Sequence, residues 1–144
     1  MPRHGPGFLY APDPVEDELL SSWVHRIALR QEVNGSTLVG RVDVDWDPPS
    51  NLLAWLAHNG EQPLSRLKSM TLREKFPNRT RRDFALSKGA AFPGCHAYCP
   101  ICALDDIEQY GGVILRASNA GLWRLTCGVH RCFLQSAKDE NQLT

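Results

Sequence analysis

The strongest constraint on the fold is a set of four metal-ligand residues in the last third of the chain: Cys99, Cys102, Cys127 and His130. They form a C-x2-C pair and, after twenty-four intervening residues, a C-x2-H pair. Two residues between ligands let one tight turn direct both side chains at a tetrahedral metal ion, so two such turns complete a zinc site. Apolar and polar residues alternate from Trp123 to Thr126, which predicts a short strand leading into the second pair.

A redox pair or a set of scattered buried cysteines would account for less of this spacing. A redox-active C-x-x-C pair needs a helix N-terminus in a βαβ unit to lower the thiol pKa, and it leaves the C-x2-H pair without a role. Cys95 and Cys132 lie close to the predicted ligands, and each is either a small buried or free thiol or a replacement for one ligand. We expect a structural Zn²⁺ ion held by the first four residues.

The sequence lacks the residue patterns of a catalytic site. Four protein ligands leave no position on the metal for water or substrate, and the zinc deaminase pattern H-x-E or C-x-E does not occur. The G-x-S-x-G, P-loop and H-E-x-x-H motifs do not occur either. Asp105 and Asp106 follow the first cysteine pair, and we expect them in the solvated first turn of a helix. We therefore expect a protein that is not an enzyme.

Length and composition limit the size of the core and the class of protein. With 144 residues, 42% of them hydrophobic, the chain can form one domain or two small subdomains with a modest core. No secretory signal opens the sequence and no apolar run could span a membrane, so no membrane partner is expected. An odd number of cysteines, five, with zinc-type spacing fits a reducing compartment, so we expect a cytoplasmic protein.

The charges cancel overall but are segregated along the chain. Residues 10–62 carry nine acidic and three basic side chains, whereas residues 63–88 carry eight basic and two acidic ones. A basic segment is the minimum requirement for binding nucleic-acid phosphates, and a solvated face without a partner is the alternative. The acidic half suits a basic protein partner. The residues from which we expect nucleic-acid contacts are Arg66, Lys68, Arg73, Lys75, Arg79, Arg81 and Arg82.

Helical patterns occupy the chain before the zinc module. The first predicted helix starts at Pro14, with Asp13 as its N-cap, and runs to about Val33. Its apolar residues recur every three to four positions, as on one buried helix face. A short helix capped by Ser36 is expected within 36–42.

Two further helices are predicted on either side of a turn that contains Gly60. The first begins at Ser50 or Asn51, and the second begins at Pro63 and carries basic residues away from its apolar face. Such a pair is typical of a helix-turn-helix, whose second helix enters a DNA groove, and equally of helices that only fill a core. Residues 71–76 either extend the second helix or add another turn.

We therefore predict a mainly α fold with a small β zinc ribbon. A basic, loosely structured connector is expected over residues 77–94. The predicted segments are an extended lead (1–12), a helix-turn-helix-like helical part (13–88), a zinc-finger or ribbon module (89–135) and a polar tail (136–144).

Several of these segments, in this order, resemble the TniQ family of transposition proteins. The resemblance covers about residues 8–135, and its specificity lies in the order of the pieces, since each alone is weak. The matching strings are PDPVEDELLSSWVHRIA (12–28), RLKSMTL (66–72), CPICALDD (99–106) and WRLTCGVHRCFL (123–134).

The resemblance implies a non-enzymatic adaptor that selects target sites for bacterial transposons. In CRISPR-associated transposons, relatives couple an RNA-guided effector complex, bound to target DNA through its guide RNA, to the AAA+ regulator TnsC, which recruits the transposase. By position, the four Cys and His residues above resemble the family's zinc ligands, and Leu20 and Trp23 resemble core residues of the first helix. Longer relatives continue beyond the second ligand pair, so the chain is either a compact adaptor or a truncated relative.

The expected mechanism is bridging. The basic residues would touch DNA or guide-RNA phosphates without reading sequence, and other surfaces would dock the ATPase. The alternative is a stand-alone, zinc-containing helix-turn-helix transcriptional regulator that reads an operator, typically as a dimer.

Overall fold

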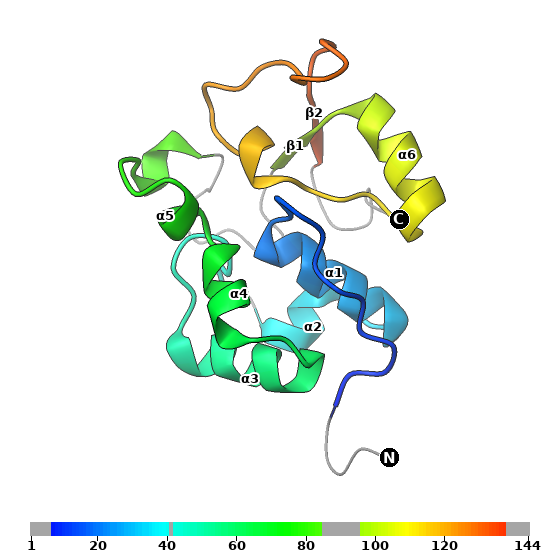
Figure 1. Cartoon of the computed structure of the whole chain (residues 1–144), viewed down its shortest axis with the longest axis vertical. Helices are drawn as coiled ribbons and strands as arrows, with labels where there is room; N and C mark the ends of the chain where they lie inside the picture. Colours follow the sequence, from blue (N-terminus) through cyan, green and yellow to red (C-terminus); the bar gives the residue numbers. More distant parts are fainter. Residues whose placement is uncertain (1–6, 41, 85–95, 138–144) are drawn as a thin grey trace.

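Helices dominate the residues that the computed structural model describes, which are 7–40, 42–84 and 96–137 (Figure 1). A two-stranded antiparallel sheet is the one sheet among them. The predicted fold class, mainly α with little strand, is confirmed. No helix in these ranges is long and apolar enough to cross a membrane. The α-helices are α1 (Leu20–Arg30), α2 (Gly35–Val39), α3 (Ser50–Gly60), α4 (Leu64–Ser69), α5 (Leu72–Lys75) and α6 (Pro100–Tyr110).

A first apolar core joins α1 to α3 and α4. Leu20 and Trp23 on α1 are fully buried, which confirms them as core residues of this helix. They pack in one cluster with Leu56 of α3 and Leu67 of α4. The indole N–H of Trp23 donates to the carbonyl of Pro12 at 2.8 Å, so burial leaves this polar group satisfied.

The turn between α3 and α4 depends on Gly60. A Cβ added there would lie 2.5 Å from Cη2 of Trp23, so a side chain would displace the largest residue of the core. Glu61 then takes a left-handed conformation (φ 56°) and ends the helix. α3 and α4 therefore occur where the sequence predicts them, although α4 has only six residues.

The predicted start of the first helix at Pro14 is wrong, because α1 begins at Leu20. Asp17 has a φ of 65°, which interrupts any helix that would run through it. Leu19 N–H donates to the carbonyl of Leu115 at 2.8 Å instead of to a helical neighbour. A partner almost a hundred residues away therefore overrides the local capping signals.

The end of α1 also differs from the prediction, Arg30 instead of Val33. Glu32 has a φ of 58°, and the N–H of Val33 turns back to the carbonyl of Ala28 at 3.0 Å. The short helix α2 lies in the region where one was expected, but Asn34 occupies the N-cap position instead of Ser36.

A second apolar core joins the first helical region to the C-terminal part. Leu19 and Leu72 pack there with Phe84, Leu115 and Ala117. In Figure 1 the C-terminal elements, yellow to red, lie together on one side of the N-terminal helices. The N-terminal and C-terminal parts therefore share a core and are not two independent domains.

The C-terminal part contains α6, the 3-10 helix η2 (Ala117–Asn119) and the sheet. Strand β1 (His96–Tyr98) pairs with β2 (Gln135–Ala137), so the sheet joins the start and the end of the described C-terminal part. The predicted strand from Trp123 to Thr126 is wrong, because only an isolated bridge from Thr126 to Phe133 forms there. A full strand is not needed to position the second ligand pair, because its own turn over residues 127–130 shapes it.

Candidate metal centre

The first ligand pair lies at the N-terminus of α6. Cys99 is the N-cap residue, and Pro100 occupies the first helical position, where its missing N–H costs no hydrogen bond. The N–H of Cys102 donates to Sγ of Cys99 at 3.4 Å, which folds the two sulfurs toward the same side. The string C-P-x-C therefore makes this turn from local preferences alone.

The second pair lies on a turn over residues 127–130. The backbone N–H groups of Val129 and His130 both donate to Sγ of Cys127 at 3.4 Å. Arg131 follows with a φ of 57°, which sends the chain back toward β2. The first sulfur of each turn, that of Cys99 or Cys127, is thus held in the same way, accepting backbone N–H groups two or three residues ahead.

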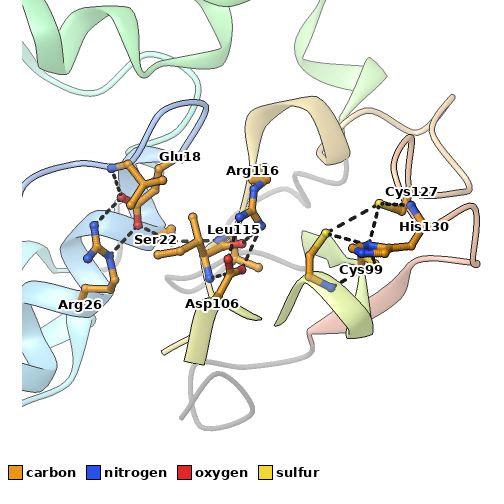
Figure 2. A network of polar contacts seen from close by, with 12 residues as sticks. Glu18, Ser22, Arg26, Cys99, Asp106, Leu115, Arg116, Cys127 and His130 are labelled. Atoms are coloured by element: carbon orange, nitrogen blue, oxygen red, sulfur yellow. Dashed lines mark hydrogen bonds and ion pairs between the residues drawn. The ribbon is translucent and has the colours of Figure 1, made fainter. Parts of the chain in front are cut away.

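The structure brings all four predicted ligands together, with their donor atoms within 4.8 Å of one another (Figure 2). His130 Nδ1 lies 3.5 Å from Cys99 Sγ and 3.3 Å from Cys102 Sγ. Cys127 Sγ lies 3.8 Å from both Cys102 Sγ and His130 Nδ1. In a tetrahedral zinc site, neighbouring S and N ligand atoms are about 3.5–3.8 Å apart. The four residues could therefore hold a metal ion.

The thiols differ in how readily they ionise. Burial opposes ionisation of Cys127, but the N–H groups of His130 and Val129 outweigh it and lower the pKa of this thiol to about 6. Burial and the neighbouring Cys99 and Cys127 sulfurs raise the pKa of Cys102 to about 12. Clustered sulfurs resist sharing negative charge, and a bound cation removes that resistance.

Cys132 lies beside the group. Its Sγ is 3.4 Å from Sγ of Cys99, and its carbonyl accepts the N–H of Cys127 at 2.9 Å. It does not belong to the four residues whose donor atoms meet. The other spare cysteine of the sequence, Cys95, falls outside the described residues.

Asp106 was expected in the solvated first turn of a helix, and this is wrong. It lies in the middle of α6, and its side chain is buried. Its carboxylate binds Arg116 at 2.7 and 2.9 Å and accepts the N–H of Ile114 at 3.2 Å (Figure 2). Hydrogen bonding to Asp106 raises the pKa of the Arg116 guanidinium. This pair fixes α6, and with it the first two cysteines, against the segment at 114–116. Asp105 stays exposed.

A buried ion pair continues this network into the N-terminal part (Figure 2). The carboxylate of Glu18 binds Arg26 through two contacts of 2.7 and 2.9 Å, and both side chains are almost fully buried. Glu18 also accepts the hydroxyl of Ser22, whose oxygen accepts the N–H of Leu115 at 3.0 Å. The sequence did not predict this pair, because Glu18 lies before the helix that carries Arg26. The spacing rules for side chains on one helix therefore do not relate the two residues.

The seven basic residues predicted to touch nucleic acid do not form one free cationic face. Three of them pair with acids of the N-terminal half, namely Arg73 with Asp47, Lys75 with Asp17 and Arg81 with Asp43. Among the others, Arg66 donates to the carbonyl of Pro14, and Arg79 lies over the ring of Trp123. Lys68 and Arg82 are exposed and have no ion-pair partner within the described ranges.

Exposed apolar side chains concentrate in the stretch of chain that carries the metal-ligand residues. Of the thirteen large exposed apolar residues in the described ranges, eight lie between positions 101 and 133. Large apolar side chains that stay exposed in such numbers are typical of a region that another molecule covers. The eight are Ile101, Leu104, Ile107, Leu122, Trp123, Leu125, Val129 and Phe133.

The chain was compared with known proteins. A search of curated proteins finds no match. The sequence model of the TniQ family matches residues 9–134, a span that includes α1, Trp123 and the four residues that could hold a metal ion. Because this match covers most of the sequence, the chain belongs to the TniQ family of transposition-associated proteins.

Proposed function

We propose that this protein is a non-enzymatic adaptor of target selection, acting in the cytoplasm between a target-DNA-binding effector and the AAA+ transposition regulator TnsC. Family membership supports a role within the transposition machinery. The observation that carries the adaptor role is the set of eight exposed large apolar side chains between residues 101 and 133. A protein that works by bridging needs such a surface, because apolar area is what protein partners desolvate.

The metal at the Cys and His cluster is a structural Zn²⁺ ion in this proposal. Three thiolates and one imidazole suit zinc, and four protein ligands leave no position for a reacting water. The ligands come from two turns separated by twenty-four residues, so the metal closes the C-terminal loop. It thereby holds the exposed apolar side chains in place.

The nucleic-acid contacts of the adaptor are led by the cations that have no acidic partner. Lys68 and Arg82 are exposed and unpaired within the described ranges, so their charge is available to phosphates. Arg73, Lys75 and Arg81 must first release Asp47, Asp17 and Asp43. The effector contact is proposed to be an RNA-guided complex with its guide RNA and target DNA, touched through the backbone.

The test uses purified protein, TnsC from the same transposon and DNA. Leu104→Ser and Leu125→Ser remove exposed apolar groups from the stretch of chain that carries the metal-ligand residues, and we expect both to weaken association with the TnsC filament at least tenfold. Leu9→Ser is the matched control, since Leu9 is exposed to a similar degree but lies outside the C-terminal part. Failure of the unmodified protein to associate with either the filament or the effector would remove the proposal.

The alternative is a stand-alone regulator that reads an operator through α3 and α4. Six residues give α4 less than two turns, and Arg66 on it is held by the carbonyl of Pro14. Tight, sequence-specific binding of duplex DNA by the isolated protein would favour this regulator, whereas weak binding without sequence preference would favour the adaptor.

A further inference from the structure

Trp123 is an exposed aromatic residue that the structure holds rigidly. Its side chain is 43% exposed, yet its ring meets Phe76 at 5.7 Å and Phe84 at 5.5 Å, both edge to face. Gly121 has no Cβ, and one added there would collide with the indole, so the indole folds back over its own backbone. An aromatic ring that is fixed from behind and still partly exposed is a preformed platform.

The platform lies where the basic segment meets the C-terminal part. Leu122 N–H donates to the carbonyl of Asp83 at 2.8 Å, and Phe84 bridges to Gly121. These contacts join the 3-10 helix η1 (Arg81–Asp83) to the residues just before Trp123. The part of the predicted connector before residue 85 is therefore docked and is not loose.

Arg79 covers the ring of Trp123. Its guanidinium carbon lies 4.1 Å from the ring centroid, the geometry of a cation–π contact. A guanidinium is planar, so a second flat group can stack on its outer side while the indole holds its inner side. No acid within the described ranges binds Arg79, and the nearby Asp83 is occupied by the capping box with Thr80.

Two further cations lie close to the pair along the chain. Arg82 is exposed three residues after Arg79 and has no ion-pair partner within the described ranges. Arg124 follows Trp123 in the chain, and its Nε donates to the carbonyl of Thr126 at 2.9 Å. A planar cation on an aromatic ring, with further arginines close along the chain, suits a flat group that is linked to negative charge, as a nucleotide base is linked to its phosphate. An apolar protein side chain gains nothing from that charge.

We propose that Arg79 and Trp123 form a stacking site for an unpaired base of a nucleic-acid strand, with Arg82 and Arg124 on the adjacent phosphates. The base is unpaired because the faces of bases within a duplex are already stacked and out of reach of a side chain. The site deepens the proposed function, since it assigns a nucleic-acid contact to one aromatic pair. A displaced DNA strand and a guide-RNA loop offer the same chemistry.

The test measures fluorescence anisotropy of labelled single strands with the full chain. Each base-bearing strand is compared with a strand of equal length and charge that lacks bases, in a DNA arm and an RNA arm. We expect the protein to prefer base-bearing strands about tenfold, and the arm with the larger ratio identifies the strand it binds. Equal affinity for both strands in both arms would overturn the stacking site.

Variants separate stacking from charge. Arg79→Lys keeps the charge but loses the planar group, so it should lose most of the base preference and keep the salt dependence. Trp123→Leu should also lose it, whereas Trp55→Leu, a change at another exposed tryptophan, should not. Arg82→Gln should weaken both strands equally and reduce the salt slope by about one phosphate.

Two outcomes keep this proposal distinct from the adaptor role. If Arg79→Lys loses the base preference but associates with TnsC as before, the stacking site is supported independently of the adaptor role. If Arg79→Lys instead keeps the base preference but lowers association with TnsC measured without nucleic acid, the stacking site is overturned. The Arg79–Trp123 pair then belongs to a protein interface. Because Arg79 is exposed, this variant is expected to fold even if Trp123→Leu does not.

Discussion

The N-terminal and C-terminal parts of this molecule are stabilised in different ways. Around α1 the largest side chains are fully buried, and the core of Leu20, Trp23, Ile27, Leu56 and Leu67 joins three helices. Between residues 101 and 133 eight large apolar side chains face solvent, and this part combines a core shared with Leu19 and Leu72 with four residues that could hold a metal ion. Under the proposed zinc site, the metal holds this part of the fold together and leaves its exposed apolar residues for a partner.

The comparison is tested most strongly by removing the metal site. Cys102→Ser should release the metal and unfold the C-terminal part, because a structural zinc contributes on the order of 10 kcal/mol in small modules. Hydrogen exchange should then show lost protection over residues 96–137 and retained protection in α1 and α3. Metal content is measured in parallel, and a variant that keeps its protection without metal would contradict the assignment.

A second substitution tests the apolar core of the N-terminal part. Trp23→Ala should cost about 3–5 kcal/mol of unfolding free energy, since it empties the centre of the first core. Urea denaturation of the metal-loaded protein measures this loss. Trp55→Ala, at an exposed indole, should cost much less. If both variants lost the same amount, the N-terminal part would not depend on its apolar core.

The buried ion pair tests the coupling between the two parts. Glu18→Gln leaves the Arg26 guanidinium buried beside a neutral amide, so we expect a loss of about 3 kcal/mol. Glu16→Gln is the surface control, expected to change stability by less than about 0.5 kcal/mol. An equal effect of the two substitutions on denaturation would show that the pair contributes no net stability.

The smallest effect is expected at Cys132. Its sulfur touches only one of the ligand sulfurs, so Cys132→Ser should keep one metal per chain and change the metal affinity by no more than about twofold. His130→Ala should lower that affinity far more. Competition with a chelator measures both. The reverse order would make Cys132 the fourth ligand and His130 the bystander.

Features that depend on neighbours in the chain were predictable. The two ligand pairs follow from two-residue spacings, and α3 and α4 occur where Pro63 and Asn59-Gly60 place them. Leu20 and Trp23 are core residues, as their spacing of three indicates. Such features need only three or four adjacent residues, so a single sequence contains the whole signal.

Features that depend on distant partners were not predictable. Asp106 looked like a solvated helix residue, but Arg116 and the N–H of Ile114 draw it inside. The basic segment looked uniformly free, but acids of the N-terminal half neutralise three of its members. A charge pattern records which charges exist and not which of them meet.

The sequence by itself determined which four residues could hold a metal ion, the helical class and the family of this protein. Only the tertiary structure decided that the first helix starts at Leu20, that Glu18 is buried against Arg26, and that Arg79 lies on Trp123. The physical reason is how far apart in the sequence the interacting residues lie. Ligand spacing and helix period act over one turn of chain, whereas these other contacts depend on how segments up to a hundred residues apart come together.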